Sequence, residues 1–249
     1  MRSFTRYAKP ALAIFLGLLA ASWSSCRKDT LHRNPPAVVQ VYNTMGDGTS
    51  FYVNLAPGHS IVYAFAMRLN NQRNGQLTFP DNERFMSVYA NPDTLSADPP
   101  AWHSELELQP GGMYSLFFTG EKNTVNGLLV KDILPVPASR DSVTYFRFAN
   151  MSSTAKVDVY LKGESAPMVP GLAFRSLSEF FRFTADASAP DYEFEFRDAE
   201  TGEVLVASVQ TGVGEYPNFN NTYLQNHATI LLSGGTTAVP LRAGTFFYR

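Results

Sequence analysis

The sequence of 249 residues contains a single cysteine, Cys26. A lone cysteine cannot form a disulfide bond within the chain, and a catalytic cysteine would need a histidine paired with it inside a folded domain. The mature protein must therefore be stabilised by the packing of its core, without disulfide bonds. The role of Cys26 has to be inferred from its neighbours.

Clusters of positive charge are also missing, and the N-terminal hydrophobic run is short. The net charge is −2 with a pI of about 6.1, so the chain offers no basic surface of the kind that nucleic acid binds. The hydrophobic residues 11–21 follow Arg2, Arg6 and Lys9. Their number suits the roughly 7–15 apolar residues of a secretory signal and is below the ~18–20 residues of a membrane-spanning helix. The sequence therefore predicts a removable export signal over residues 1–25.

The residues around Cys26 resemble the lipobox of bacterial lipoproteins. Two small residues, Ser24 and Ser25, precede the cysteine. In that family the peptidase cuts directly before the cysteine, whose sulfur carries a diacylglycerol. The resemblance implies lipidation of Cys26 and attachment to a membrane through this lipid. The alternative is an ordinary cleaved signal followed by an incidental cysteine.

The residues after Cys26 bear on the location of the protein. The second residue of the mature chain would be Arg27, whereas an aspartate at this position resembles a signal that retains lipoproteins at the inner membrane. The next two residues, Lys28-Asp29, are similar to the basic-then-acidic tag of surface-exposed Bacteroidetes lipoproteins. We therefore expect an outer-membrane protein that faces the cell exterior. Residues 26–36 are polar and end in two prolines, so they are predicted to form a tether.

Recognisable catalytic and metal-binding patterns are absent from the sequence. No G-x-S-x-G motif occurs, and the four histidines form no pair at metal-ligand spacing, so we predict no enzyme, metal site or cofactor. Glu193 and Glu195 would lie roughly 7 Å apart on one strand face, which is the separation found in inverting glycosidases. Charges that alternate with apolar residues are also typical of a solvent-facing sheet surface. The histidines are His32, His59, His103 and His227.

Apolar residues alternate with polar ones, as in β-strands, rather than recurring at helical spacing. Phe146 and Phe148 share one strand face with Arg147 on the other, so residues 143–161 predict a hairpin of half-buried strands. Residues 192–209 predict a second hairpin. The chain is also rich in Phe (19) and Tyr (12). The fold class is therefore predicted to be all-β.

Two stretches of the chain repeat the same order of strands and turns. Asn43 aligns with Asn150, 107 residues later, and Gly120 aligns with Gly234, 114 residues later. Two pairings in the same order at nearly the same offset indicate an internal duplication. Prolines interrupt the segment between the copies and mark a boundary there. The prediction is two tandem antiparallel β-sandwich domains over residues 37–138 and 139–249.

The second copy resembles the bacterial family called domain of unknown function 4397. Members of that family open with an R-φ-x-N strand, continue with VDVYL and close on a Y-x-φ-φ-φ-x-G strand. The matching residues here are 147–150, 157–161 and 229–234, and the first copy has the closing tyrosine at Tyr114. The resemblance implies immunoglobulin-like sandwiches on secreted or anchored proteins. It implies no catalytic residues.

Two loops combine aromatic rings with polar groups. Residues 215–227 interleave tyrosine and phenylalanine with asparagine, and a proline-rich stretch ends at a tryptophan. Flat rings and amides can recognise a saccharide or a peptide, and long loops tend to be functional. The alternative is that the rings close the ends of the sandwich and the asparagines form turns. The candidate binding residues are Tyr216, Asn218, Phe219, Asn220, Tyr223 and Trp102.

The sequence thus predicts a non-catalytic, lipid-anchored cell-envelope protein that acts as a surface binding or structural module. A glycan or an envelope protein is the expected partner. The alternatives are an accessory subunit of a surface assembly and, less favoured, a polysaccharide-processing enzyme. A contiguous exposed apolar patch would favour the accessory subunit, and carboxylates that converge in one cleft would favour the enzyme.

Overall fold

The computed structural model describes residues 34–55, 61–80, 84–92, 99–214 and 221–248. Nearly all regular structure in these ranges is β-strand, and their only helical segment is the short 3-10 turn Tyr63–Phe65. The predicted all-β class is therefore confirmed. None of the helical structure in the described ranges is long and apolar enough to cross a membrane. Residues Pro35–Arg249 form one compact unit.

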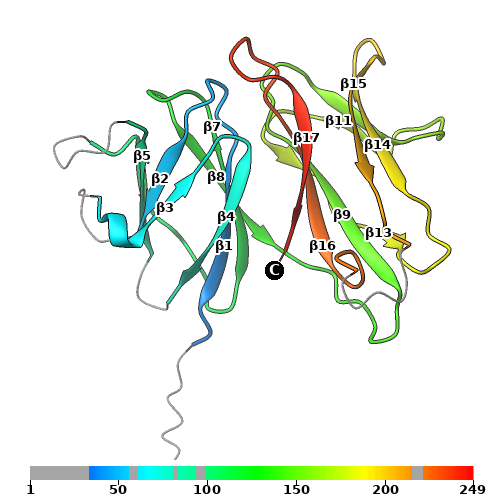
Figure 1. Ribbon diagram of the computed structural model, residues 1–249, viewed down its shortest axis with the longest axis horizontal. Coiled ribbons are helices and arrows are strands. Elements are labelled where there is room, and N and C mark those ends of the chain that lie inside the picture. Colours follow the sequence, from blue (N-terminus) through cyan, green and yellow to red (C-terminus); the bar gives the residue numbers. More distant parts are fainter. Residues whose placement is uncertain (1–33, 56–60, 81–83, 93–98, 215–220, 249) are drawn as a thin grey trace, which may run out of the picture. The chain divides into compact units, whose positions relative to one another are not determined.

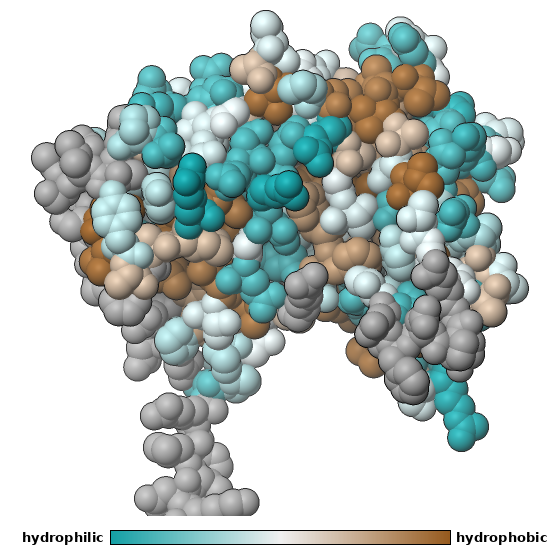
Figure 2. All heavy atoms as spheres, viewed as in Figure 1, coloured by the Kyte–Doolittle hydropathy of each residue, from teal (hydrophilic) through white to brown (hydrophobic). Residues whose placement is uncertain are grey.

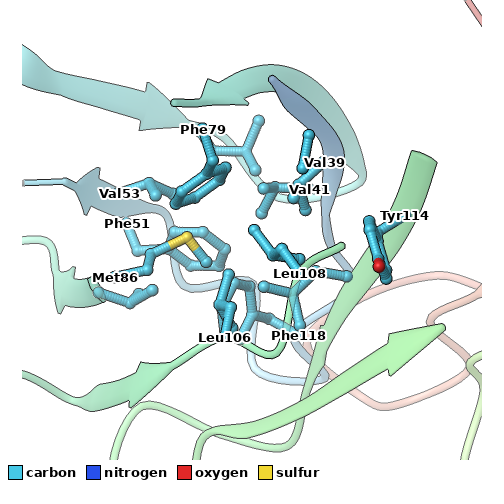
Figure 3. Packing of buried hydrophobic residues seen from close by; sticks show 14 of the residues in the cluster. Val39, Val41, Phe51, Val53, Phe79, Met86, Leu106, Leu108, Tyr114 and Phe118 are labelled. Carbon is cyan, nitrogen blue, oxygen red and sulfur yellow. The ribbon is translucent and has the colours of Figure 1, made fainter. Parts of the chain in front are cut away.

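Strands β1 to β8, which we call the first half, form two sheets that face each other. One sheet has the order β4-β1-β7-β8 and the other β3-β2-β5-β6 (Figure 1). Apolar residues at alternate positions fill the space between them, among them Phe51, Phe79 and Phe118 (Figure 3). The strands are β1 (Ala37–Asn43), β2 (Phe51–Asn54), β3 (Ala66–Leu69), β4 (Arg73–Phe79), β5 (Phe85–Ala90), β6 (Trp102–Glu105), β7 (Met113–Thr119) and β8 (Asn126–Asp132).

Strands β9 to β17, the second half, form another pair of sheets. Their orders are β12-β9-β16-β17, with β13 also paired to β9, and β11-β10-β14-β15. Phe148 and Phe194 meet edge to face in its core, with ring centroids 5.0 Å apart, a favourable arrangement for aromatic pairs. The strands are β9 (Val143–Asn150), β10 (Val157–Leu161), β11 (Val169–Leu172), β12 (Ser176–Leu177), β13 (Phe181–Thr184), β14 (Tyr192–Asp198), β15 (Val204–Gln210), β16 (His227–Ser233) and β17 (Arg242–Phe247).

The two halves share one pattern of strand pairing. Strand β1 pairs antiparallel with β4 and parallel with β7, which pairs antiparallel with β8. Likewise β9 pairs antiparallel with β12 and β13 and parallel with β16, which pairs antiparallel with β17. Asn43 lies opposite Phe118, and Asn150 lies opposite Leu232. Equivalent positions are therefore 107 residues apart on β1 and β9, and 114 residues apart on β7 and β16.

Asn43 and Asn150 end the equivalent strands β1 and β9 and make the same set of hydrogen bonds. In each case Nδ2 donates to two backbone carbonyls, one in the following turn and one in the facing sheet. Oδ1 accepts from the backbone N–H two residues further on. The partners are Thr49, Leu69 and Met45 for Asn43, and Ala155, Leu172 and Ser152 for Asn150, at 2.8 to 3.2 Å.

The predicted hairpin over residues 143–161 is wrong. Strands β9 and β10 lie in different sheets, and the chain crosses between them at the turn that Asn150 holds. Because the side chain satisfies backbone groups of the turn, the chain can leave its sheet without pairing with itself. The predicted hairpin over residues 192–209 is confirmed, since β14 and β15 pair antiparallel.

The expectation of a half-buried strand is also wrong for β9, because every residue of β9 is buried. The same holds for β16. One face of these strands belongs to the core of the second half, and the other packs against β1 and β7 of the first half. Tyr42 of β1 meets Phe246 of β17 edge-on across this interface, with centroids 5.4 Å apart. The buried residues of this interface cluster are Tyr42, Phe117, Ala149, Met151 and Leu231.

Candidate functional site

Several residues that the sequence singles out lie outside the described residues. The lipidation site belongs to the segment before residue 34, and four of the candidate binding residues fall within 215–220. The expected roles of these residues stay predictions. They are Cys26, Tyr216, Asn218, Phe219 and Asn220, together with the histidines His32 and His59.

The other two candidate binding residues pack against the cores. Trp102 opens β6 and meets Phe118 edge-on, with centroids 4.9 Å apart. Its indole also covers Gly127, where a Cβ atom would lie 3.0 Å from the ring. Tyr223 is half-buried against Phe247, at 5.1 Å between ring centroids, and burial raises the pKa of its hydroxyl. Both side chains therefore pack against the core, which agrees with the alternative in which these rings have a structural role.

The two glutamates of β14 are engaged by cations. Lys162 Nζ lies 2.8 Å from Glu193 Oε2, and Arg197 Nη2 lies 2.5 Å from Glu195 Oε2. The Arg197 guanidinium also lies 4.2 Å from the centre of the Tyr160 ring. These contacts are those of an ion-pair network on a sheet surface. Within the described ranges, no three His, Cys, Asp or Glu side chains gather as metal ligands would.

A buried polar network joins the two halves. Arg147 Nη2 of β9 lies 2.8 Å from Asp132 Oδ1 at the end of β8, and these side chains are 5% and 0% exposed. Ser115 Oγ donates to Asp132 Oδ2 at 2.9 Å. Arg147 donates to Ser115 at 2.9 Å, to Thr229 at 3.0 Å and to the hydroxyl of Tyr248. Placing Arg147 on a solvent-facing strand surface is therefore wrong, because that surface is the interface between the halves.

Two members of this network, Ser115 and Thr229, occupy equivalent positions, 114 residues apart on β7 and β16. Arg147 occupies the position on β9 that is equivalent to Gln40 on β1, 107 residues earlier. The negative charge, Asp132, comes from the first half and the positive charge from the second. The ion pair can therefore form only when the halves pack together.

Burial controls the ionisation of the network. Burial raises the pKa of Asp132, and the neighbouring Arg147 opposes this rise. Burial also raises the pKa of Tyr248 to about 12 and that of Tyr42 well above its usual value, so both phenols stay protonated at neutral pH. The ring of Phe180 covers the guanidinium at 5.0 Å. The network therefore lies enclosed between the halves and is not open to a ligand.

A groove of about 300 Å³ lies where the turns of the two halves meet. Equivalent residues of both copies line it, with Thr44 matching Met151 and Gly120 matching Gly234. Both glycines have left-handed backbones, with φ of 100° and 84°, and a Cβ atom on either would lie 2.3 Å or less from a backbone oxygen. Part of the groove wall must therefore be bare backbone. Its polar and aromatic side chains include Glu121, Thr124, Asn126, Ser153, Phe174 and Arg175.

Comparisons with known proteins leave the family open. No protein-family model matches the chain, and no curated protein matches it. Among solved structures, the chain is similar to a DUF1812 protein of Bacteroides thetaiotaomicron that is named for a suspected role in polysaccharide binding. The two share 11% identity with a TM-score of 0.20, over 86% of this chain and 98% of that chain. A similarity at this level assigns neither a family nor a ligand, and the resemblance to domain of unknown function 4397 stays a prediction.

Proposed function

We propose that the protein is a non-catalytic binding module of the bacterial cell envelope, built from two copies of a β-sandwich and held at the outer membrane by a lipid on Cys26. The observation that carries the binding role is the groove between the two halves. Backbone, hydroxyl, amide, charged and aromatic groups line it together. Its volume of about 300 Å³ lies at the lower end of the ~300–1,000 Å³ typical of ligand sites.

The packing of the two halves supports this role, because it holds the walls of the groove in place. Thr236 Oγ1 of the second half donates to the carbonyl of Gly46 in the first half at 2.5 Å. Arg175 Nη2 donates to the carbonyl of Gly127 at 3.0 Å, again from the second half to the first. A site whose walls are already ordered loses little conformational entropy when a ligand binds.

The lipid anchor is supported by the export signal and by the residues around Cys26. Residues 34–36 carry no regular structure and lead directly into β1, and the two prolines among them favour extended backbone. A tether that ends there would hold the module away from the bilayer, facing the exterior of the cell.

Replacing Cys26 by alanine tests the anchor. Cells that express the wild-type protein should incorporate radiolabelled palmitate into it, and the protein should partition into the detergent phase. Cys26→Ala should lose both properties, because no other cysteine can carry the diacylglycerol. Protease added to intact cells should degrade the wild-type module if it faces the exterior. A labelled Cys26→Ala protein, or a wild-type module protected from protease, would contradict the proposal.

One observation favours the second candidate, an accessory subunit of a surface assembly. Strand β15 is an edge strand without a charged residue, and its Val204 and Val209 are 47% and 52% exposed. Figure 2 shows hydrophobic residues gathered at the upper right of the view, over the part of the second half where Figure 1 places β11, β14 and β15. Uncharged edge strands tend to pair with other chains.

Val209→Lys tests this candidate, since a lysine on an edge strand disfavours pairing with another strand. If β15 joins two copies, light scattering of the detergent-solubilised protein should give twice the monomer mass for the wild type and the monomer mass for Val209→Lys. A wild-type monomer would exclude pairing between copies at this edge.

A further inference from the structure

Phe174 is an unusual residue for the wall of a groove. It lies in the turn between β11 and β12, is 40% exposed, and belongs to none of the buried hydrophobic clusters. An apolar ring of this size left in water costs free energy that a ligand covering the ring would recover. Its exposure therefore needs a reason in either folding or binding.

The first half shows that folding of the turn does not require an aromatic residue. Gln72 and Arg175 are equivalent, because both have left-handed φ values, 55° and 60°. The N–H of each also donates to the carbonyl of the asparagine that ends β1 or β9. The residue before Gln72 is Asn71, which donates to a backbone carbonyl of its own half at 2.8 Å. The same turn thus forms with a polar residue at the position of Phe174.

The groups around Phe174 match the two kinds of surface on a sugar ring. The C–H face of a pyranose stacks on an aromatic ring, and its hydroxyls need both acceptors and donors. The carboxylate of Glu121 accepts, the guanidinium of Arg175 donates, and the amide of Asn126 does both. A guanidinium has five N–H donors, and within the described part of the chain Arg175 uses one of them, at Nη2, in a hydrogen bond to the carbonyl of Gly127.

The charge of the groove bears on the kind of sugar. Among the described residues that line it, the ionisable side chains are Glu121 and Arg175, and their charges cancel. A site that selects uronic acids or sulfated sugars would need an excess of positive charge. The balance therefore favours an uncharged ligand.

We propose that this groove binds a neutral saccharide unit, with Phe174 stacked on the apolar face of the ring and Glu121 and Arg175 hydrogen-bonded to its hydroxyls. The inference rests on the proposed function as a surface binding module and adds the ligand class and the residues of the site. Because both halves line the groove, the saccharide contacts both copies of the sandwich at once.

The test measures binding of fluorescently labelled oligosaccharides to the full-length protein in detergent, by fluorescence anisotropy. The probes are neutral maltotetraose, cellotetraose and tetra-N-acetylchitotetraose, and acidic tetragalacturonate. We expect saturable binding of at least one neutral probe, weakened at least about tenfold in Phe174→Ala and retained in Phe174→Trp, which keeps the stacking surface. Tyr63→Ala, which removes a ring that is 58% exposed and does not line the groove, should bind like the wild type.

Three results would overturn the inference. They are no saturable binding of any neutral probe, equal affinity in Phe174→Ala and the wild type, or a preference for tetragalacturonate. Unchanged melting temperatures would show that the variants are folded. Cys26→Ala separates this site from the anchor, since it should lose palmitate and keep oligosaccharide binding. A palmitate-labelled wild type that binds no probe would leave the anchor intact and remove the saccharide site.

Discussion

Replacing Asp132 by alanine should lower the free energy of unfolding by about 3–5 kcal/mol. The guanidinium of Arg147 would stay buried between the halves without its counter-charge, since the two side chains are 0% and 5% exposed. Ser115 would lose the carboxylate to which it donates. Equilibrium unfolding in urea, followed by circular dichroism, measures the change.

Two further variants isolate the cause. Asp132→Ala combined with Arg147→Met should recover most of the loss, because exchanging a buried ion pair for apolar residues is often neutral or stabilising. Glu193→Ala removes one partner of an exposed ion pair with Lys162 and should leave the urea midpoint unchanged. An Asp132→Ala protein as stable as the wild type would mean that the ion pair does not hold the halves together.

Asn43→Ala and Asn150→Ala should each lower the free energy of unfolding by about 3 kcal/mol. Both asparagines are fully buried, and each substitution removes three hydrogen bonds. It also removes these partners from backbone groups that are buried or half-buried, and leaving a buried group unpaired costs about 1–3 kcal/mol. Because the two sets of bonds are the same, the two variants should lose similar amounts of stability in urea unfolding.

Asn126→Ala is the matched control for these variants. Asn126 is exposed, and its amide donates to a single backbone carbonyl in its own turn, so its loss should leave the urea midpoint unchanged. A large loss for Asn150→Ala beside a negligible loss for Asn43→Ala would argue against equivalent roles in the two halves.

Local sequence patterns predicted several of the strands and the repeated asparagine. Alternation of apolar residues depends on the geometry of a single strand, so it identified the strands that contain Phe146, Phe148 and Phe194. Asn43 and Asn150 could be matched because their surrounding strands and turns repeat in order. The hairpin over residues 143–161 failed because alternation gives the faces of a strand and not its neighbour. Which strand follows in which sheet is determined here by the side chain of Asn150, which holds the turn where the chain crosses between the sheets.

Features that depend on the packing of the two halves could not be predicted in the same way. Arg147 sits at an alternate position that normally faces solvent, and its burial follows from a second sheet packed on that face. The R-φ-x-N motif was the one sequence feature that pointed to a special role for Arg147, because it places an arginine at a fixed position on that strand. Phe174 was missed because it lies in a turn without alternation, and its partners in the groove come from turns far apart in the sequence.

The position of β1 determines how the module would carry a mechanical load. The predicted tether ends at residue 36, directly before the first residue of this strand, and Thr44 and Gly46, just past its last residue, line the groove. A pull between a bound surface and the membrane would therefore run lengthwise along β1. Its hydrogen bonds to β4 and β7 lie across that direction, so they would be strained together rather than opened one after another. Unfolding of the first half under such a load would then require the rupture of two complete ladders, and its rate would be set by the unfolding rate of that half.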